Sequence, residues 1–107
     1  MTELKHRRVL ITGAAGGLGR RMAALCARRG ADLVLWDLDP VALDAAARAV
    51  DAAGPGRVDR STIDITDREA VYALAAQVGP VDVLVNNAGI VSGKSLLETS
   101  DEQIERT

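Results

Sequence analysis

The sequence predicts an α/β fold in which helices cover both faces of a parallel sheet, a doubly wound arrangement. Short runs rich in Val, Leu and Ile alternate with Ala-rich segments of helical periodicity, at intervals of about 25 residues. Most of these runs are continuous rather than alternating, which is typical of strands with both faces covered. The chain has 107 residues, so it holds at most one domain.

Four strands and three complete helices are expected. The strands are expected at residues 7–12, 32–36, 57–63 and 81–85, and the helices at residues 18–29, 40–53 and 67–78. Gly30 ends the first helix, and Pro40 opens the second at its first turn. Thr66 caps the third helix, with Glu69 completing a capping box. A fourth helix is expected to begin at Asp101, shortly before the chain stops, so the sheet is expected to be incomplete.

Composition and charge argue against several functional classes. The formal net charge is −2 with both signs interspersed, so nucleic acid and anionic membranes are not expected partners. No stretch approaches the roughly 20 apolar residues that span a bilayer, and no signal peptide is visible. Cys26 is the only cysteine and His6 the only histidine, so neither an internal disulfide nor a metal site is expected. These features indicate a cytoplasmic protein.

A glycine-rich turn, residues 13–19 with the sequence GAAGGLG, joins the first strand to the first helix. Glycines let a backbone come close to phosphate groups, and free N–H groups at a helix start favour negative charge. The turn therefore predicts the pyrophosphate site of a Rossmann-like nucleotide-binding domain. The alternative is that a tight strand-to-helix turn needs glycine for its geometry alone. The spacing G-x-G-x-x-G is not met, because Met22 stands at the third glycine position.

The glycines of the turn match another motif, and a second motif follows the fourth strand. Residues 12–19 contain T-G-x-x-x-G-x-G, and residues 86–89 read N-N-A-G. On these motifs the sequence resembles the common form of the short-chain dehydrogenase/reductase family, over essentially the whole chain. Gly13, Gly16 and Gly19 also satisfy T-G-x-x-G-x-x-G of the extended form, which includes sugar epimerases, but N-N-A-G favours the common form.

Asp37 is the residue expected to select the cofactor. It ends the second strand about 20 residues after the glycine turn, where a carboxylate can accept both ribose hydroxyls of an adenosine. The same charge would repel a 2′-phosphate, and neither Leu38 nor Gly16 is basic, so NAD is favoured over NADP. The alternative is that Asp37 is a solvent-exposed strand end or serves the helix that begins at Pro40.

The resemblance implies further contacts with the cofactor. Asp64 and the backbone of Ile65 would meet the adenine, unless Asp64 simply ends its strand. Asn87 would belong to a cofactor-facing loop and, with Thr12, would tie adjacent strands together. The expected cofactor-binding residues are Gly13, Gly16, Gly17, Leu18, Gly19, Asp37, Asp64, Ile65, Asn87, Ala88 and Gly89. No catalytic or metal-binding residue is expected within the chain.

Three other patterns are assigned no function. Residues 88–95 satisfy a relaxed phosphate-loop pattern, but Ala88 replaces its first glycine and no chain remains for a magnesium-binding strand. Tyr72 has Ala76 rather than lysine four residues later, so it is expected to be a partly exposed helix residue. The apolar stripe of the first helix is expected to be Leu18, Met22, Leu25 and Cys26. Cys26 is accordingly expected to be a core residue rather than a nucleophile.

The catalytic chemistry of the family would lie beyond this sequence. Its Ser, Tyr, Lys and Asn residues would follow Thr107, so the chain is expected to be the N-terminal part of an enzyme of roughly 250 residues. The resemblance implies a homo-oligomeric, NAD-dependent oxidoreductase that interconverts a secondary alcohol and a ketone by hydride transfer. Residues 33–37 and 99–107 are similar to a branch with retinol and hydroxysteroid dehydrogenases, which indicates a lipophilic substrate. The alternatives are a non-catalytic NAD-binding or regulatory module and an extended-form epimerase.

Overall fold

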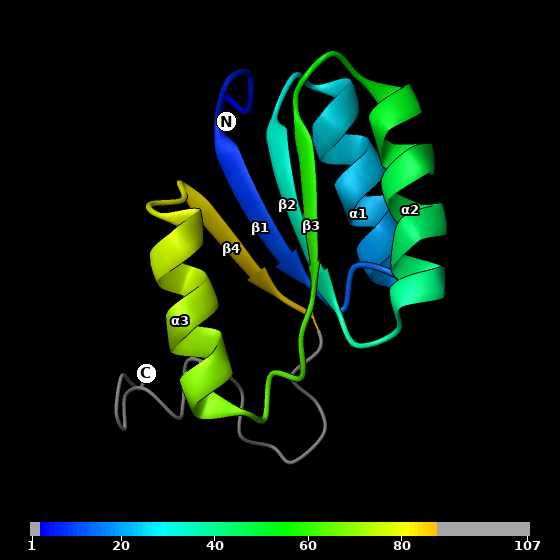
Figure 1. Cartoon of the computed structure of the whole chain (residues 1–107). Coiled ribbons are helices and arrows are strands. Elements are labelled where there is room, and N and C mark those ends of the chain that lie inside the picture. The colour runs from blue at the N-terminus through cyan, green and yellow to red at the C-terminus, as the bar shows by residue number, and fades with distance from the viewer. Residues whose placement is uncertain (1–2, 88–107) are drawn as a thin grey trace.

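The chain folds into a four-stranded parallel sheet, as the sequence predicts (Figure 1). The computed structural model describes residues 3–87. Its elements are β1 (Arg8–Thr12), α1 (Gly17–Arg28), β2 (Asp32–Asp37), α2 (Pro40–Ala53), β3 (Val58–Thr62), α3 (Arg68–Val78) and β4 (Val83–Asn86). The strand order is β3-β2-β1-β4, and each neighbouring pair is parallel. The helix expected to begin at Asp101 lies outside the described residues.

The register brings the carboxyl ends of all four strands to one edge of the sheet. Thr12 at the end of β1 pairs with Trp36 in β2 on one side and with Asn86 in β4 on the other. Thr62, the last residue of β3, pairs with Asp37. Because every strand points the same way, the segments that follow β1, β2 and β3 all begin at this edge (Figure 1).

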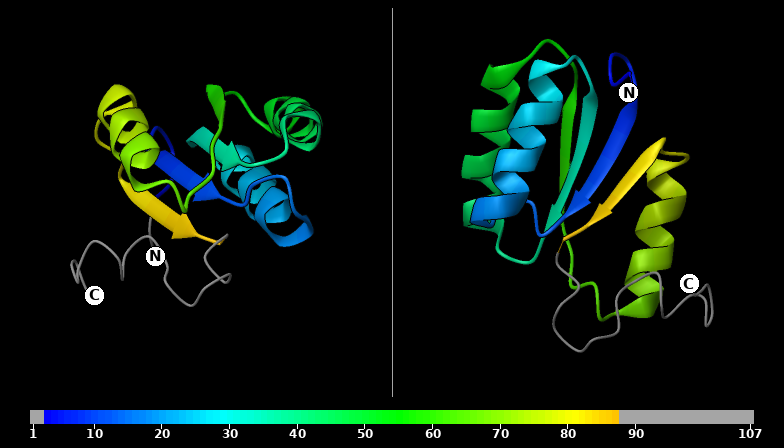
Figure 2. Two further views of the ribbon diagram at one scale, coloured as in Figure 1. Left: turned by 60° about the horizontal axis from the view of Figure 1, so that its bottom comes forward. Right: turned by 180° about the vertical axis from the view of Figure 1, so that it is seen from behind.

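Helices cover both faces of the sheet, which makes the fold doubly wound. Figure 2 shows from two further directions that α1 and α2 lie on one face and α3 on the other. The larger core packs alternate residues of β1 and β2 against α1 and α2, with Ile11, Leu35 and Leu43 fully buried. The smaller core packs Trp36 and its neighbours in the sheet against Val71 of α3.

The sequence-based expectation for the buried side of α1 is wrong for Leu18 and Leu25, whereas Met22 and Cys26 are partly buried and pack against the larger core. Leu18 is 63% exposed and Leu25 is 49% exposed, whereas the buried residues of this helix are Gly19, Ala23 and Ala27. Small side chains at this spacing let the helix axis come close to the sheet, and larger ones would hold it away. Cys26 is half-buried beside the core, in partial agreement with the core position expected for it.

The start of α3 also differs from the expectation. Its N-cap is Asp67, whose side chain accepts a hydrogen bond from the Ala70 backbone N–H. Thr66 instead donates its hydroxyl to the Asp64 carboxylate, at 2.6 Å, so the capping box with Glu69 does not form. A carboxylate one residue later in the sequence satisfies the helix start, because an aspartate N-cap is as favourable as a threonine.

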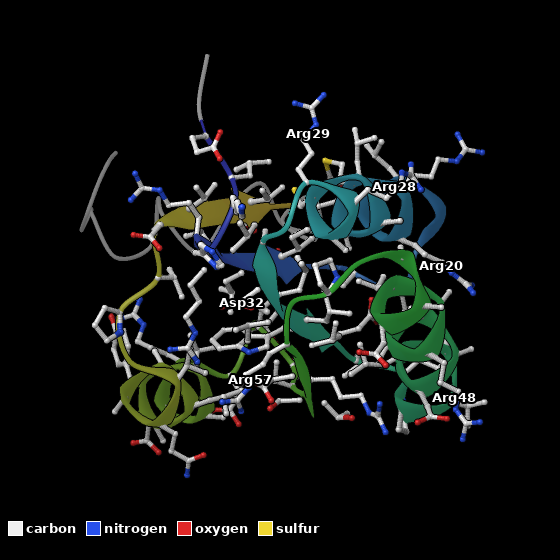
Figure 3. The ribbon with its side chains drawn as sticks, turned by 90° about the horizontal axis from the view of Figure 1, so that it is seen from above. Arg20, Arg28, Arg29, Asp32, Arg48 and Arg57 are labelled. Atoms are coloured by element: carbon white, nitrogen blue, oxygen red, sulfur yellow. The ribbon has the colours of Figure 1, made fainter. Side chains whose placement is uncertain are left out.

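Three strands are shorter than expected, β2 is one residue longer, and β3 is more exposed than the other strands. Burial is continuous along β1 and β2, but β3 lies at the sheet edge and three of its five residues are exposed. At the edge of the sheet formed by the amino-terminal ends of the strands, Asp32 accepts a hydrogen bond from the Arg57 backbone N–H at 2.8 Å. Figure 3 shows both residues at this edge. Here a side chain joins the start of β2 to the start of β3.

Candidate nucleotide-binding site

The residues expected to bind a cofactor converge at the carboxyl edge of the sheet. The glycine turn follows β1, Asp37 ends β2, Asp64 follows β3 and Asn87 follows β4. Two side-chain hydrogen bonds connect these segments directly. Asp37 accepts from the Ala15 backbone N–H at 2.9 Å, and Asn87 donates to the Gly13 carbonyl at 3.2 Å. Residues up to 74 positions apart therefore meet around the glycine turn.

The glycine turn has a defined backbone conformation. Gly13 has a φ of 68°, in the left-handed region that glycine adopts without steric cost. The Ala14 N–H donates to the Trp36 carbonyl at 3.1 Å, and the Gly16 N–H donates back to Gly13 at 3.2 Å. The turn is thus attached to β2 on one side and closed on itself.

Gly19 is required by the fold. A Cβ atom at this position would lie 2.3 Å from the Gly13 carbonyl oxygen and 2.9 Å from Nδ2 of Asn87. Neither neighbour can move freely, because Asn87 donates to that same carbonyl and Gly13 belongs to the closed turn. The third glycine of the motif therefore lets α1 approach the turn that precedes it.

Gly17 has a different environment. A Cβ atom built on it meets nothing within 4 Å, and at Gly16 the nearest atom is an ordinary contact at 3.6 Å. Within residues 3–87, no acceptor is found for the backbone N–H groups of Gly17, Leu18 and Gly19, and no side chain caps the helix. The packing of the described residues does not account for glycine at 17, so the open space there fits a ligand that approaches the backbone.

Asp37 is half-buried, and the structure gives both of its carboxylate oxygens a partner. Oδ2 accepts from Ala15, while Oδ1 accepts from the N–H groups of Leu38 at 2.7 Å and Asp39 at 3.3 Å. The helix that begins at Pro40 is capped by Asp39, not by Asp37. The carboxylate is therefore joined to the glycine turn and does not serve as the cap of α2.

Asp64 and Ile65 follow β3 at the same edge. The Asp64 carboxylate is exposed and accepts hydrogen bonds from the side chain and the backbone of Thr66, which lower its pKa below the usual 3.8. Ile65 is partly buried against the core that contains Trp36. The backbone N–H of Ile65 has no acceptor among residues 3–87, so it is available to a ligand.

The two consecutive asparagines hold strands together. Thr12 is fully buried and donates its hydroxyl to Asn86 across the β1–β4 pair at 3.1 Å. The side chain that ties β4 to Thr12 is thus Asn86, whereas Asn87 reaches the glycine turn. Ala88 and Gly89, expected to face the cofactor, lie outside the described residues, as does the pattern at 88–95.

The remaining candidates do not join this site. Tyr72 is an exposed residue of α3, as expected. Burial raises the pKa of the Cys26 thiol, against an opposing effect of the Arg29 guanidinium. A raised pKa makes the thiolate less available at neutral pH, in keeping with a packing role. Residues 3–87 contain no group of three or more His, Cys, Asp or Glu side chains suited to a metal ion.

Ala14 and Ala15 contribute to this site although no sequence pattern indicates them. Both act through backbone N–H groups, which every non-proline residue carries, so the residue type gives no signal. The assembled edge offers free N–H donors at the start of α1, a neighbouring carboxylate and an open position at Gly17. Such an arrangement can bind a phosphate group beside a hydroxyl-bearing group.

Comparison with known proteins gives concordant matches. The sequence model of the family described as short chain dehydrogenase matches residues 7–107. Epidermal retinol dehydrogenase 2 of Mus musculus is 47% identical over 103 residues, covering 92% of this chain and 33% of that protein. The chain therefore spans about a third of the length of curated relatives such as this one.

Solved structures show the same fold. NAD+-bound xylitol dehydrogenase superimposes with a TM-score of 0.72 at 29% identity, over 82% of this chain and 35% of that chain. A metagenomic short-chain oxidoreductase in complex with NADP gives a TM-score of 0.75 at 35% identity, over 83% of this chain and 42% of the other. No helix among the described residues is long and apolar enough to cross a bilayer.

Proposed function

Because this chain belongs to the short-chain dehydrogenase/reductase family, we propose that it is the nucleotide-binding part of an NAD-dependent oxidoreductase that interconverts a secondary alcohol and a ketone. The observation that carries the proposal is the uncapped start of α1, with open space at Gly17 and the Asp37 carboxylate beside the same turn. The nicotinamide, when bound, supplies the position that gains or loses hydride.

The pyrophosphate would be held at the start of α1. The N–H groups of Gly17, Leu18 and Gly19 point their positive ends out of the first helical turn, where the helix dipole adds to their attraction for an anion. Gly16 and Gly17 leave room for the phosphate oxygens to approach the backbone. Gly13 and Asn87 would act on the cofactor indirectly, since they shape the turn.

NAD rather than NADP is proposed because of Asp37. A 2′-phosphate would bring additional negative charge next to this half-buried carboxylate, and the exposed neighbour Leu38 offers no cation to balance it. The solved relatives include an NAD+ complex and an NADP complex. The support for NAD therefore comes from the residues of this chain.

The adenine would lie at the end of β3. The Asp64 carboxylate, whose pKa the hydrogen bonds from Thr66 lower below the usual 3.8, can accept from an exocyclic amino group. The Ile65 N–H is free to donate to a ring nitrogen. These two groups together would present one acceptor and one donor, which is the complement of an adenine edge.

The catalytic residues and the substrate pocket are proposed to belong to a longer protein. The only tyrosine of this chain, Tyr72, has no lysine four residues later. Relatives named as retinol dehydrogenases support a lipophilic alcohol or ketone as substrate. We also propose that the whole protein is a homo-oligomer and lies in the cytoplasm. The single, free Cys26 supports a location in this reducing compartment.

Isothermal titration calorimetry of the chain with NAD, NADP and ADP-ribose tests the proposal. We expect NAD and ADP-ribose to bind similarly, since most contacts are to the adenosine and pyrophosphate, and NADP to bind at least tenfold more weakly. Leu38→Arg tests the effect of a positive charge near the ribose 2′ position. We expect this substitution to reduce the difference between the affinities for NAD and NADP. Equal affinity for NAD and NADP would remove the proposed cofactor preference, and no binding of any of the three would overturn the proposal.

A chain that binds NAD tightly could also act as a non-catalytic NAD-binding module. Micromolar or tighter binding of NAD by the 107-residue chain itself would support the module. Weak binding of NAD, no tighter than that of ADP-ribose, would support the enzyme part.

A further inference from the structure

The structure assigns a second task to Asp37: it is a positioning residue that fixes the shape of the glycine turn, in addition to any contact with ribose. This inference rests on the proposed function, because the turn is taken as the phosphate site. Its basis is the hydrogen bond of 2.9 Å from the Ala15 N–H to Oδ2 of Asp37, which links residues 22 positions apart. The carboxylate and the turn are therefore one structural unit.

The successive N–H groups of the turn have distinct partners. Ala14 donates to the main chain of β2, Ala15 donates to Asp37, and Gly16 donates back to Gly13. The N–H groups of Gly17, Leu18 and Gly19 have no acceptor within residues 3–87, and Arg20 then donates to the Gly16 carbonyl at 2.9 Å. Ala15 thus has the last anchor to β2 before the free donors begin, and the orientation of those donors depends on it.

The side chain of Asp37 is itself held in place. Oδ1 accepts from Leu38 at 2.7 Å and from Asp39 at 3.3 Å, which limits rotation of the carboxylate. The bond to Ala15 is charge-assisted and half-buried, so it is stronger than a bond between neutral groups. A rigid carboxylate at the end of β2 can therefore hold the turn.

The acceptor capacity of Asp37 limits its contact with ribose. A carboxylate has about four acceptor positions, and three are already used by Ala15, Leu38 and Asp39. If both ribose hydroxyls donate to Asp37, one N–H bond must be given up. The longest is that of Asp39, at 3.3 Å, so we expect the bond of Ala15 to persist when nucleotide is bound.

A consequence follows for changes in cofactor preference. Removal of the Asp37 carboxylate lowers the repulsion of a 2′-phosphate, but it also releases Ala15 and loosens the phosphate site. Such a variant should lose affinity for any ligand of the turn, including one that has no ribose. This loss is opposite in sign to the effect of the charge alone, because removing a negative charge favours binding of an anion.

The first test uses the ligand-free chain. Amide hydrogen exchange is measured by NMR in the wild type, in Asp37→Leu and in Asp39→Asn. The leucine is similar in size and has no acceptor, whereas asparagine keeps the cap of α2 and removes the same charge two residues away. We expect exchange at Ala15 to accelerate at least tenfold in Asp37→Leu only, with Leu10 in β1 unchanged. An unchanged exchange rate at Ala15 in Asp37→Leu would contradict the inference that the Asp37 carboxylate holds the turn through Ala15.

If Asp37→Leu does not fold, the wild type still decides the question. A through-hydrogen-bond scalar coupling between the Ala15 amide nitrogen and the Asp37 carboxylate carbon is expected in the wild-type chain. Absence of this coupling, together with rapid amide exchange at Ala15, would contradict the inference that Asp37 holds the turn through Ala15.

The second test measures the affinity for inorganic pyrophosphate, which contains neither ribose nor adenine. We expect Asp37→Leu to bind it at least threefold more weakly than the wild type, and Asp39→Asn to bind it equally or more tightly. Equal or tighter binding by Asp37→Leu would remove the positioning role. If the wild type binds no pyrophosphate, the proposed phosphate site fails. The exchange experiment still decides whether Asp37 holds the turn through Ala15.

Discussion

The starts of the three helices show how one fold treats the same backbone groups in two ways. At the start of α2 the Asp39 side chain accepts from the Val41 and Ala42 N–H groups, and at the start of α3 Asp67 accepts from the Ala70 N–H. The start of α1 has Gly16 as its N-cap, with no side-chain bond and no acidic residue in its first turn. The chain thus supplies an aspartate cap at α2 and α3, whereas residues 3–87 supply no side-chain cap at α1.

The difference indicates where a ligand completes the structure. Unsatisfied N–H groups at a helix start destabilise the helix unless water or an anion accepts from them. At α1 two further residues, Asp37 and Asn87, bond to the preceding turn, although no side chain within residues 3–87 caps the helix. An organised but uncapped start is suited to binding an anion, and the capped starts of α2 and α3 are the internal controls.

The largest expected effect comes from Gly19→Ala. The added Cβ would clash with the Gly13 carbonyl at 2.3 Å, so α1 must shift from the turn. We expect a loss of about 2–3 kcal/mol in the free energy of unfolding and loss of ADP-ribose binding. Urea denaturation followed by the fluorescence of Trp36, the only tryptophan and 2% exposed, measures the stability. Wild-type stability would show that α1 does not need its close approach.

Gly17→Ala is the matched substitution, two residues earlier in the same helical turn. Its Cβ meets nothing within 4 Å, so stability should be unchanged or higher by up to about 1 kcal/mol, because alanine favours helix. Affinity for ADP-ribose should fall about tenfold, or about 1.4 kcal/mol, because the methyl group occupies the space proposed for phosphate. Calorimetry measures the affinity, and wild-type affinity in Gly17→Ala would place the phosphate elsewhere.

Removal of the N-cap of α3 should have the opposite effect to Gly17→Ala, with stability lowered and ADP-ribose affinity unchanged. Asp67→Ala deletes the acceptor of the Ala70 N–H and is expected to lower the free energy of unfolding by about 1 kcal/mol. ADP-ribose should bind as to the wild type, because this helix start contributes no donor to the site. Asp67→Ser, which keeps a capping oxygen, should restore most of the stability, and a failure to do so would argue against the cap.

The smallest effect is expected from Thr66→Val, which removes the hydroxyl that contributes most to the lowered pKa of Asp64. The carboxylate pKa should rise toward 3.8, as measured by NMR titration. Since the folded pKa lies below the unfolded value, this contribution to stability is present above pH 3.8 and is lost as the pH falls through the folded pKa. Denaturation should therefore show a small difference in stability between the wild type and Thr66→Val that is larger at pH 7 than at pH 3.

Much of the fold could be predicted from local sequence. The bounds of α2 were expected within a residue because Pro40 and Gly54 mark them, and a Cβ at Gly54 would lie 1.8 Å from the Ala27 carbonyl. One error concerns the N-cap of α3, which is Asp67 rather than Thr66, and another concerns the packing of α1 on the sheet. Leu18 and Leu25 were expected in the core because they are apolar at helical spacing, but the sheet accepts only the small residues of α1 at close range. Hydrophobicity alone does not measure how closely two elements approach.

The sequence by itself determined the α/β alternation, the glycine turn and the strand ends that bear Asp37 and Asp64, because periodicity and turn residues are local properties. Only the tertiary structure decided how these groups are used. It joined Ala15 to Asp37, placed Asn87 over Gly13 and left Gly17 open. Backbone donors and the space around a glycine depend on segments far apart in the chain, so their roles emerge only when the strands are brought into register.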